Sequence, residues 1–307
     1  MTDNATLSNS PIPPTVMTDS PHPEPEPPMS TTLAPSPRPT VSTARTADMA
    51  PAKVSTWRVI RSEWIKFWSV RSTSFTLLSA GIATILFGMI FSWATGSGDA
   101  APGPAALLTD PVDLALAGTE ITEMMVGILG VLFVAGEYST GLVRTAFAAA
   151  GRRTRVIVSK ATVVASTVFA MSAVAVTAAV ILGQAVYTGD GITVAATEVL
   201  DVTFGTMVYL TGVALMGVAL GFILRSTASG IATLLGGVLI GPNLLNLLPD
   251  SVTDVFMKYL PSEAGAAMMT QVSDPDLLNT GPAYAVFIAW VVGLLVLADV
   301  MVRRRDA

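Results

Sequence analysis

The sequence contains no cysteine and a single histidine, His22, among its 307 residues. The lack of cysteine excludes a disulfide framework, a thiolate nucleophile and any metal site built on sulfur. Because His22 lies in a proline-rich stretch, we expect neither imidazole base catalysis nor a zinc ion held by histidines. Charge is scarce too, since 13% of the residues are charged, against roughly a quarter in soluble domains. This composition indicates a protein that resides in lipid.

Residues 1–54 have no aromatic side chain and hold more than half of the chain's 20 prolines. Proline removes backbone donors, and too little apolar surface is present to offset the entropy lost on ordering. We therefore predict a disordered, Pro/Ser/Thr-rich cytoplasmic tail with no signal-peptide core. Three interpretations stay open: a site for a partner or for phosphorylation, a dispensable extension, or a start codon misassigned ahead of Met49.

Long uncharged runs follow the tail and match the thickness of a bilayer, which a helix of about 20 residues spans. Four such runs cover 75–93, 161–183, 202–224 and 226–248. A further span, 283–302, contains Asp299, which we expect to pair with Arg303 one helical turn later. The second span in chain order is irregular, since 124–136 is short and a longer version includes Glu120 and Glu123. The prediction is an all-α, polytopic membrane protein with six transmembrane helices within 73–307.

The basic residues are sorted along the chain. Sixteen of the 17 precede the first span, follow the last, or lie in the loops after the second and fourth spans; Lys258 is the exception. Lysine and arginine are retained on the cytoplasmic side, so we expect both termini there and the protein in the plasma membrane. Acids occupy the opposite loops, and the net charge of -5 is a difference between two faces that does not favour a nucleic-acid partner.

A shorter segment, 55–72, precedes the first span and places Trp57, Trp64 and Trp68 on one helical face. Tryptophan around an apolar stripe flanked by bases is typical of an amphipathic helix that lies in the membrane interface, with lipid as its partner. The alternative is a plain cytosolic extension of the first span.

The loop after the second span contains an alanine-rich segment between Gly141 and Gly151, followed by several bases. We predict a short cytosolic helix there, capped by Ser139 or Thr140. Such a helix is suited to docking against a partner, whereas ordinary positive charge of a cytoplasmic loop is the alternative explanation.

This loop resembles a known family signature. The elements in question are Glu137-Tyr-Ser-Thr-Gly141, Arg144, the alanine-rich stretch, Arg152-Arg153 and Ser159-Lys160. Their order is similar to the cytosolic signature of bacterial ABC transporter permeases of the second type. The segments Arg61-Ser62-Glu63-Trp64-x-Lys66 and Tyr259-Leu260-Pro261-Ser262-x-Ala264-Gly265 are similar too, so the resemblance covers 57–305. Gly151 departs from the proline of many relatives.

The resemblance implies an exporter-type fold in which two permeases, identical or sister subunits, pair and each rests on an ABC ATP-binding subunit. By the same analogy the loop helix is the coupling helix. Its ATPase-coupling residues are then Glu137, Gly141, Arg144, Arg152, Arg153 and Lys160. ATP and Mg²⁺ would bind to the partner, because this chain has no G-x-x-x-x-G-K-[ST] loop. We therefore expect a permease that exports a hydrophobic or amphipathic small molecule, is not an enzyme, and carries no cofactor or metal of its own.

Polar residues within the predicted spans mark a possible substrate path. They are Glu123 in the second span and Pro242, Asn243 and Asn246 in the fifth. Glu123 also permits a different function, an ion-gradient-driven carrier in which this carboxyl is the proton site. An intramembrane enzyme is disfavoured because the spans contain no histidine.

Two further patterns concern helix packing and the loop after the fifth span. Gly217-x-x-x-Gly221 and Gly237-x-x-x-Gly241 predict faces of close helix contact. The apolar segment 254–269 predicts one or two interfacial helices broken at Pro261.

Overall fold

The computed structural model describes residues 55–96, 110–187, 196–245, 247, 256–270 and 277–305, and the predicted tail lies outside them. Every regular element in these ranges is helical. Five segments are long and apolar enough to cross a membrane: Arg71–Gly96, Pro111–Ser139, Arg153–Val186, Glu198–Leu224 and Thr280–Arg305. The chain is therefore consistent with an all-α, multi-pass membrane protein, as predicted.

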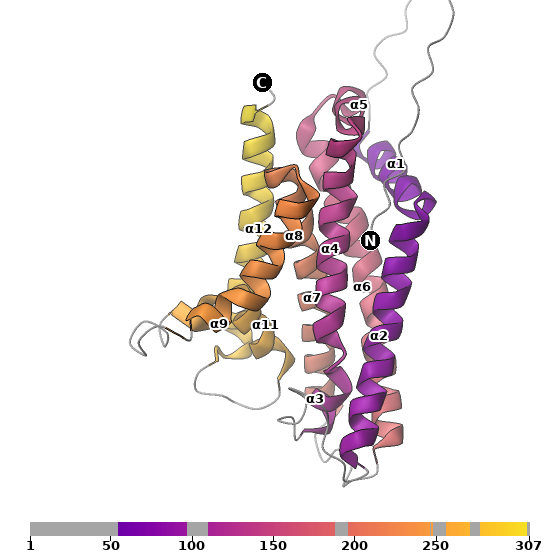
Figure 1. Cartoon of the computed structure of the whole chain (residues 1–307), viewed down its shortest axis with the longest axis vertical. Helices are drawn as coiled ribbons and strands as arrows, with labels where there is room; N and C mark the ends of the chain where they lie inside the picture. Colours follow the sequence, from indigo (N-terminus) through magenta and orange to yellow (C-terminus); the bar gives the residue numbers. More distant parts are fainter. Residues whose placement is uncertain are drawn as a thin grey trace, which may run out of the picture. The chain divides into compact units, whose positions relative to one another are not determined.

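Four long helices form the centre of the bundle (Figure 1). They are α2 (Arg71–Gly96), α4 (Thr119–Ser139), α6 (Arg153–Val186) and α7 (Ala196–Leu224), with α12 (Thr280–Arg305) packed on α7. The short helix α3 (Pro111–Leu116) precedes α4 and completes the irregular second span. Asp110 caps α3 by accepting a hydrogen bond from the Val112 amide, and Pro111 occupies the first helical turn, where its missing N–H costs nothing.

Glycine allows α4 and α7 to approach closely. A Cβ atom on Gly217 would lie 2.2 Å from the Gly127 carbonyl oxygen, and one on Gly221 would lie 2.8 Å from the Val134 Cβ. The predicted contact face at these two glycines is confirmed. The second predicted face is wrong at Gly237, whose Cβ position has no atom within 4 Å among the described residues.

The exact number of six spans is not confirmed. In place of a straight fifth span the chain forms α8 (Thr227–Leu235), the π-helical segment η2 (Gly236–Ile240) and α9 (Gly241–Leu245). The apolar part, Thr227–Val238, is shorter than the five long segments. The sequence here is uncharged over a full span length, but Gly236, Gly237 and Gly241-Pro242 break the regular α-helical hydrogen bonding.

The C-terminal ends of α7 and α12 nevertheless lie at the same end of the bundle. The Arg305 guanidinium donates to the Ile223 carbonyl at 3.0 Å. Arg153, at the start of α6, donates to the carbonyls of Val302 and Arg303 at 3.3 Å each. Since α7 and α12 both finish here, the chain between them must return to the opposite end.

The same end also carries α1 (Thr56–Ser69) and α5 (Leu142–Ala150) (Figure 1). We call it the basic end, because every described base except Lys258 lies there. These bases are found in α1, at the first residue of α2, in α5, at the start of α6, at Arg225 after α7 and in the last turn of α12. The i,i+4 ion pair predicted there is confirmed, with Arg303 and Asp299 2.8 Å apart.

The loop segment after α9 also forms the helices expected of it. The 3-10 turn η3 (Met257–Tyr259) is followed by α11 (Pro261–Met269), so the predicted break at Pro261 is confirmed. The Trp290 indole of α12 donates to the Tyr259 carbonyl at 2.8 Å, which fixes this segment against α12.

Candidate functional site

Two left-handed glycines bound the short helix α5. Gly141 has φ 75° and Gly151 has φ 66°, and both conformations favour glycine because a Cβ would strain the backbone. The predicted side-chain cap is wrong. The hydroxyls of Ser139 and Thr140 instead donate to the Gly136 carbonyl at 2.8 and 3.1 Å, which closes the last turn of α4. The chain therefore turns sharply into and out of α5.

Helix α5 is packed on one side only. Val143 and Ala150 are buried, whereas Leu142, Arg144 and Ala148 are exposed. A small apolar cluster formed by Val59, Ala150 and Val156, with Phe147 against it, joins α5 to α1 and α6. The outer face of α5 is thus available to a partner at the basic end.

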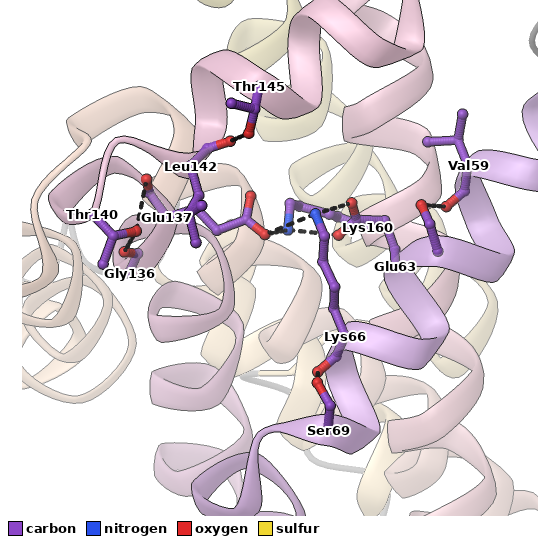
Figure 2. A network of polar contacts seen from close by, with 11 residues as sticks. Val59, Glu63, Lys66, Ser69, Gly136, Glu137, Thr140, Leu142, Thr145 and Lys160 are labelled. Atoms are coloured by element: carbon purple, nitrogen blue, oxygen red, sulfur yellow. Dashed lines mark hydrogen bonds and ion pairs between the residues drawn. The ribbon is translucent and has the colours of Figure 1, made fainter.

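Beside α5, four charged side chains from three helices form a compact cluster (Figure 2). The Lys160 ammonium of α6 lies 2.8 Å from Glu63 Oε2 of α1 and 2.8 Å from Glu137 Oε1 of α4. The Lys66 ammonium of α1 lies 2.8 Å from Glu63 Oε1 and 3.4 Å from Glu137 Oε1. We call these four residues the ion-pair cluster; its two bases and two acids neutralise one another.

Burial makes this cluster much stronger than surface ion pairs. The side chain of Lys160 is 0% exposed and that of Glu63 is 2% exposed, while Lys66 is 44% exposed. The third side of the Lys160 ammonium faces the Phe133 ring, 4.1 Å from its centroid. The Phe67 ring packs edge-on against Phe133 with centroids 5.2 Å apart. Because the aromatic rings and the surrounding helices exclude water, the attraction between these charges is weakly screened.

The cluster shifts the pKa values of its two α1 members. Burial acts to raise the pKa of the Glu63 carboxyl, but the adjacent ammonium groups of Lys160 and Lys66 outweigh it and hold that pKa below its ordinary value of 4.5. Burial acts to lower the pKa of Lys66, yet Glu63 and Glu137 raise it above 10.5. Glu63 and Lys66 therefore both stay charged across the neutral range.

The ion-pair cluster adjoins a cavity of about 350 Å³ between α1, α5 and α6. Glu63 and Lys66 line it from α1, and Thr145, Ala146 and Ala149 line it from α5. A shift of α5 relative to α1 would therefore change the surroundings of Glu63 directly.

The structure separates the predicted coupling residues into two groups and leaves Arg152 apart from both. Glu137 and Lys160 meet inside the ion-pair cluster, where Lys160 is inaccessible to a partner. Arg144 and Arg153 line a second cavity of about 810 Å³ together with Arg225. Arg225 has φ 55° and holds its guanidinium carbon 5.2 Å from the centroid of the Tyr138 ring. Arg152 lines neither this cavity nor the one beside the cluster, and lies on the α12 side of α6.

The predicted substrate path is only partly brought together. Glu123 lies beside Tyr209 of α7, in hydrogen-bonding contact. The cavity that it shares with Leu234 and Val238 holds about 10 Å³, which is room for one water molecule and not for a transported compound. Pro242 is buried in α9, and Asn243 belongs to the same helix. Asn246 lies outside the described residues.

Sequence reasoning missed the role of Glu63 and the aromatic rings at the cluster. One signal was present: Glu63 is four residues from both Val59 and Phe67, so a carboxylate lies in the middle of the face that α1 buries. A charge at such a position needs a partner from elsewhere in the fold. The partners Lys160 and Phe133 come from distant parts of the chain, which no local pattern connects.

The sequence matches no model of a known protein family, and no curated protein matches it significantly. Within the described ranges, no group of three or more His, Asp or Glu side chains is arranged to hold a metal ion. Any functional conclusion therefore depends on the geometry of the basic end and on the sequence resemblance.

Proposed function

We propose that this chain is the membrane-spanning permease subunit of an ATP-driven ABC transporter, with α5 as the helix that receives movement from an ATP-binding partner. The observation that carries the proposal is the connection between α5 and the bundle. Helix α5 is exposed on its outer face, bounded by two left-handed glycines, and adjoins a buried ion-pair cluster that links α1, α4 and α6.

This geometry supports a specific transmission route. Glu137 lies in the last turn of α4, four residues before Gly141, and Lys160 lies two turns into α6. A force on α5 therefore reaches two long helices whose ends are held together by charge. Closure of the ATPase on ATP would shift the permease between inward-open and outward-open arrangements, provided the partner contacts differ between the two states.

The predicted coupling residues then have different roles. Arg144 lies on the exposed contact surface, together with Leu142 and Ala148, which the sequence did not single out. Glu137 and Lys160 transmit the movement and do not touch the partner. The basic end then faces the cytoplasm with both termini, the permease pairs with a second copy or a sister subunit in the plasma membrane, and the exported compound is hydrophobic or amphipathic.

Site-specific crosslinking tests this function, because the chain contains no cysteine and a single introduced one is unique. Ala148→Cys is placed on the outer face of α5, and Val174→Cys, 71% exposed in the long helix α6, is the matched control. After treatment of native membranes with a thiol-reactive crosslinker, we expect Ala148→Cys to capture a polypeptide with a phosphate-loop sequence. We expect Val174→Cys not to capture it. Capture by neither variant, with no ATPase copurifying, contradicts the proposal.

The contact between Glu123 and Tyr209 within an apolar span supports a second candidate, a carrier driven by an ion gradient. Transport measured in vesicles separates the two. A permease stops when ATP is removed and tolerates an uncoupler, whereas a carrier persists without ATP, stops with the uncoupler and is inactivated by Glu123→Gln.

A further inference from the structure

A third cavity at the basic end is lined by four arginines among its seven lining residues. It holds about 790 Å³ between the start of α1, the start of α6 and the end of α12. Its lining residues are Thr56, Arg152, Arg153, Thr154, Arg155, Val158 and Arg303. Four arginines therefore line one space, and the Arg303 guanidinium is paired with Asp299 at 2.8 Å. Among the described residues, no carboxylate lines the cavity itself.

The fold holds some of these arginines in position. Arg153 donates to the Val302 and Arg303 carbonyls of α12, and Arg303 donates to the Thr154 hydroxyl at 2.8 Å. These bonds connect the start of α6 with the end of α12 and fix the cavity's shape. Arg152 is exposed and makes no hydrogen bond or ion pair within the described part of the chain.

The arginines also lie at an electrostatically unfavourable place. The first turn of α6 contains Arg153 and Arg155, has no acidic residue, and receives no side-chain cap from Arg152. A helix N-terminus carries a partial positive charge, so bases there repel the helix dipole. An anion inside the cavity would offset the positive charge gathered here and the partial charge of this helix end together.

The cavity opens toward surface of the kind that faces lipid. Val158, which lines it, is 47% exposed on a candidate membrane span. Trp57 follows Thr56 at the cavity's rim and is 70% exposed. Exposed tryptophan beside arginine is typical of the boundary between hydrocarbon and headgroups. The expected ligand is therefore an anion that also carries an apolar part.

We propose that this cavity binds the phosphate headgroup of an anionic phospholipid from the leaflet at the basic end. The guanidinium groups of Arg152 and Arg155 contact the phosphate, and the acyl chains lie along Val158 and the outer face of α6. Bound lipid bridges the start of α6 to the end of α12. This role requires the basic end to lie at a membrane surface and is independent of an ATP-binding partner.

Native mass spectrometry of the full-length protein in detergent tests the proposal, with phosphatidylglycerol and phosphatidylcholine as probes. The double variant Arg152→Gln/Arg155→Gln removes two cavity guanidinium groups. The control, Arg61→Gln/Arg304→Gln, removes the same charge from exposed positions that do not line the cavity. If the double variant fails to fold, the single variant Arg152→Gln, at an exposed side chain, replaces it in the measurement.

We expect one phosphatidylglycerol to bind in preference to phosphatidylcholine. Since a hydrogen bond to a charged group contributes about 1.5–3 kcal/mol, the cavity variant should weaken this binding at least ~10-fold, and the control should weaken it much less. Equal weakening by the two double variants would show diffuse attraction and overturn the proposal. The lipid assignment is overturned if inorganic phosphate at equal concentration displaces phosphatidylglycerol. It is also overturned if the cavity variant loses a copurifying ATPase while its lipid binding is unchanged.

Discussion

Replacing Lys160 by methionine is expected to destabilise the basic end strongly. Methionine keeps most of the side chain's length and apolar volume, so the change removes the charge with little loss of packing. Glu63, 2% exposed, then loses one of its two lysines, and Glu137 keeps only the longer contact to Lys66 at 3.4 Å.

The magnitude follows from this burial. Removing one partner of a buried ion pair typically costs 3–5 kcal/mol, because the remaining charge stays desolvated. Lys66 still lies 2.8 Å from Glu63, so we expect the lower part of that range, about 3 kcal/mol. The matched control is Lys66→Met. This lysine is 44% exposed, and its loss should cost about 1 kcal/mol or less.

Reversible unfolding in mixed detergent micelles, followed by circular dichroism, measures both losses. A second arm adds Glu63→Gln to Lys160→Met. It should recover part of the stability, because Lys160→Met leaves two carboxylates facing one lysine and Glu63→Gln removes the excess negative charge. Two results would contradict a buried and weakly screened ion pair. In the first, Lys160→Met costs no more stability than Lys66→Met; in the second, the effects of Lys160→Met and Glu63→Gln are additive.

The remaining predictions concern pH and glycine. The pKa of Glu63 is lowered and that of Lys66 is raised, so the stability from Glu63 is present above pH 4.5 and lost as pH falls through its lower folded value. The stability from Lys66 is present below pH 10.5 and lost as pH rises through its higher folded value. Unfolding midpoints measured against pH test both losses, and Glu63→Gln should reduce the loss of stability at acid pH. Gly151→Ala should lower the free energy of unfolding by about 1–2 kcal/mol because φ is 66°. The control Gly136→Ala lies in a helix, and no atom of the described residues is within 4 Å of its Cβ position, so it should be neutral or stabilising. Equal effects of the two variants in thermal unfolding would contradict this. Gly217→Ala should destabilise by about 1–3 kcal/mol, since the added methyl meets backbone of α4, and unchanged stability would show that the helices separate freely.

The long apolar spans could be predicted from the sequence because a bilayer imposes a length and a composition on any helix that crosses it. The segment 226–248 met both requirements, yet in the structure its regular α-helix is interrupted by the π-helical segment Gly236–Ile240 before α9 begins at Gly241. Hydropathy counts apolar residues and is insensitive to backbone geometry, so a broken helix and a straight one give the same signal.

At the candidate site, the short helix and its flanking glycines were predictable, since glycine is the residue that left-handed turns require. Its cap was not, because the hydroxyls of Ser139 and Thr140 could either accept from an amide at the start of α5 or donate to a carbonyl at the end of α4. In the structure they donate to the Gly136 carbonyl. Arg144 was correctly placed on the loop helix, but no local pattern indicated that Arg153 would bond to the end of α12.

The sequence by itself determined that this chain is helical, rich in membrane-length apolar segments, and sorted into a basic and an acidic side. These properties depend on local composition and on spacing along one helix. Only the tertiary structure decided that Glu63, Glu137 and Lys160 meet in one buried cluster, and that Arg152, Arg155 and Arg303 surround one cavity. Glu63 and Lys160, which are 97 residues apart, are brought together by helix packing, and burial then sets the strength of their interaction.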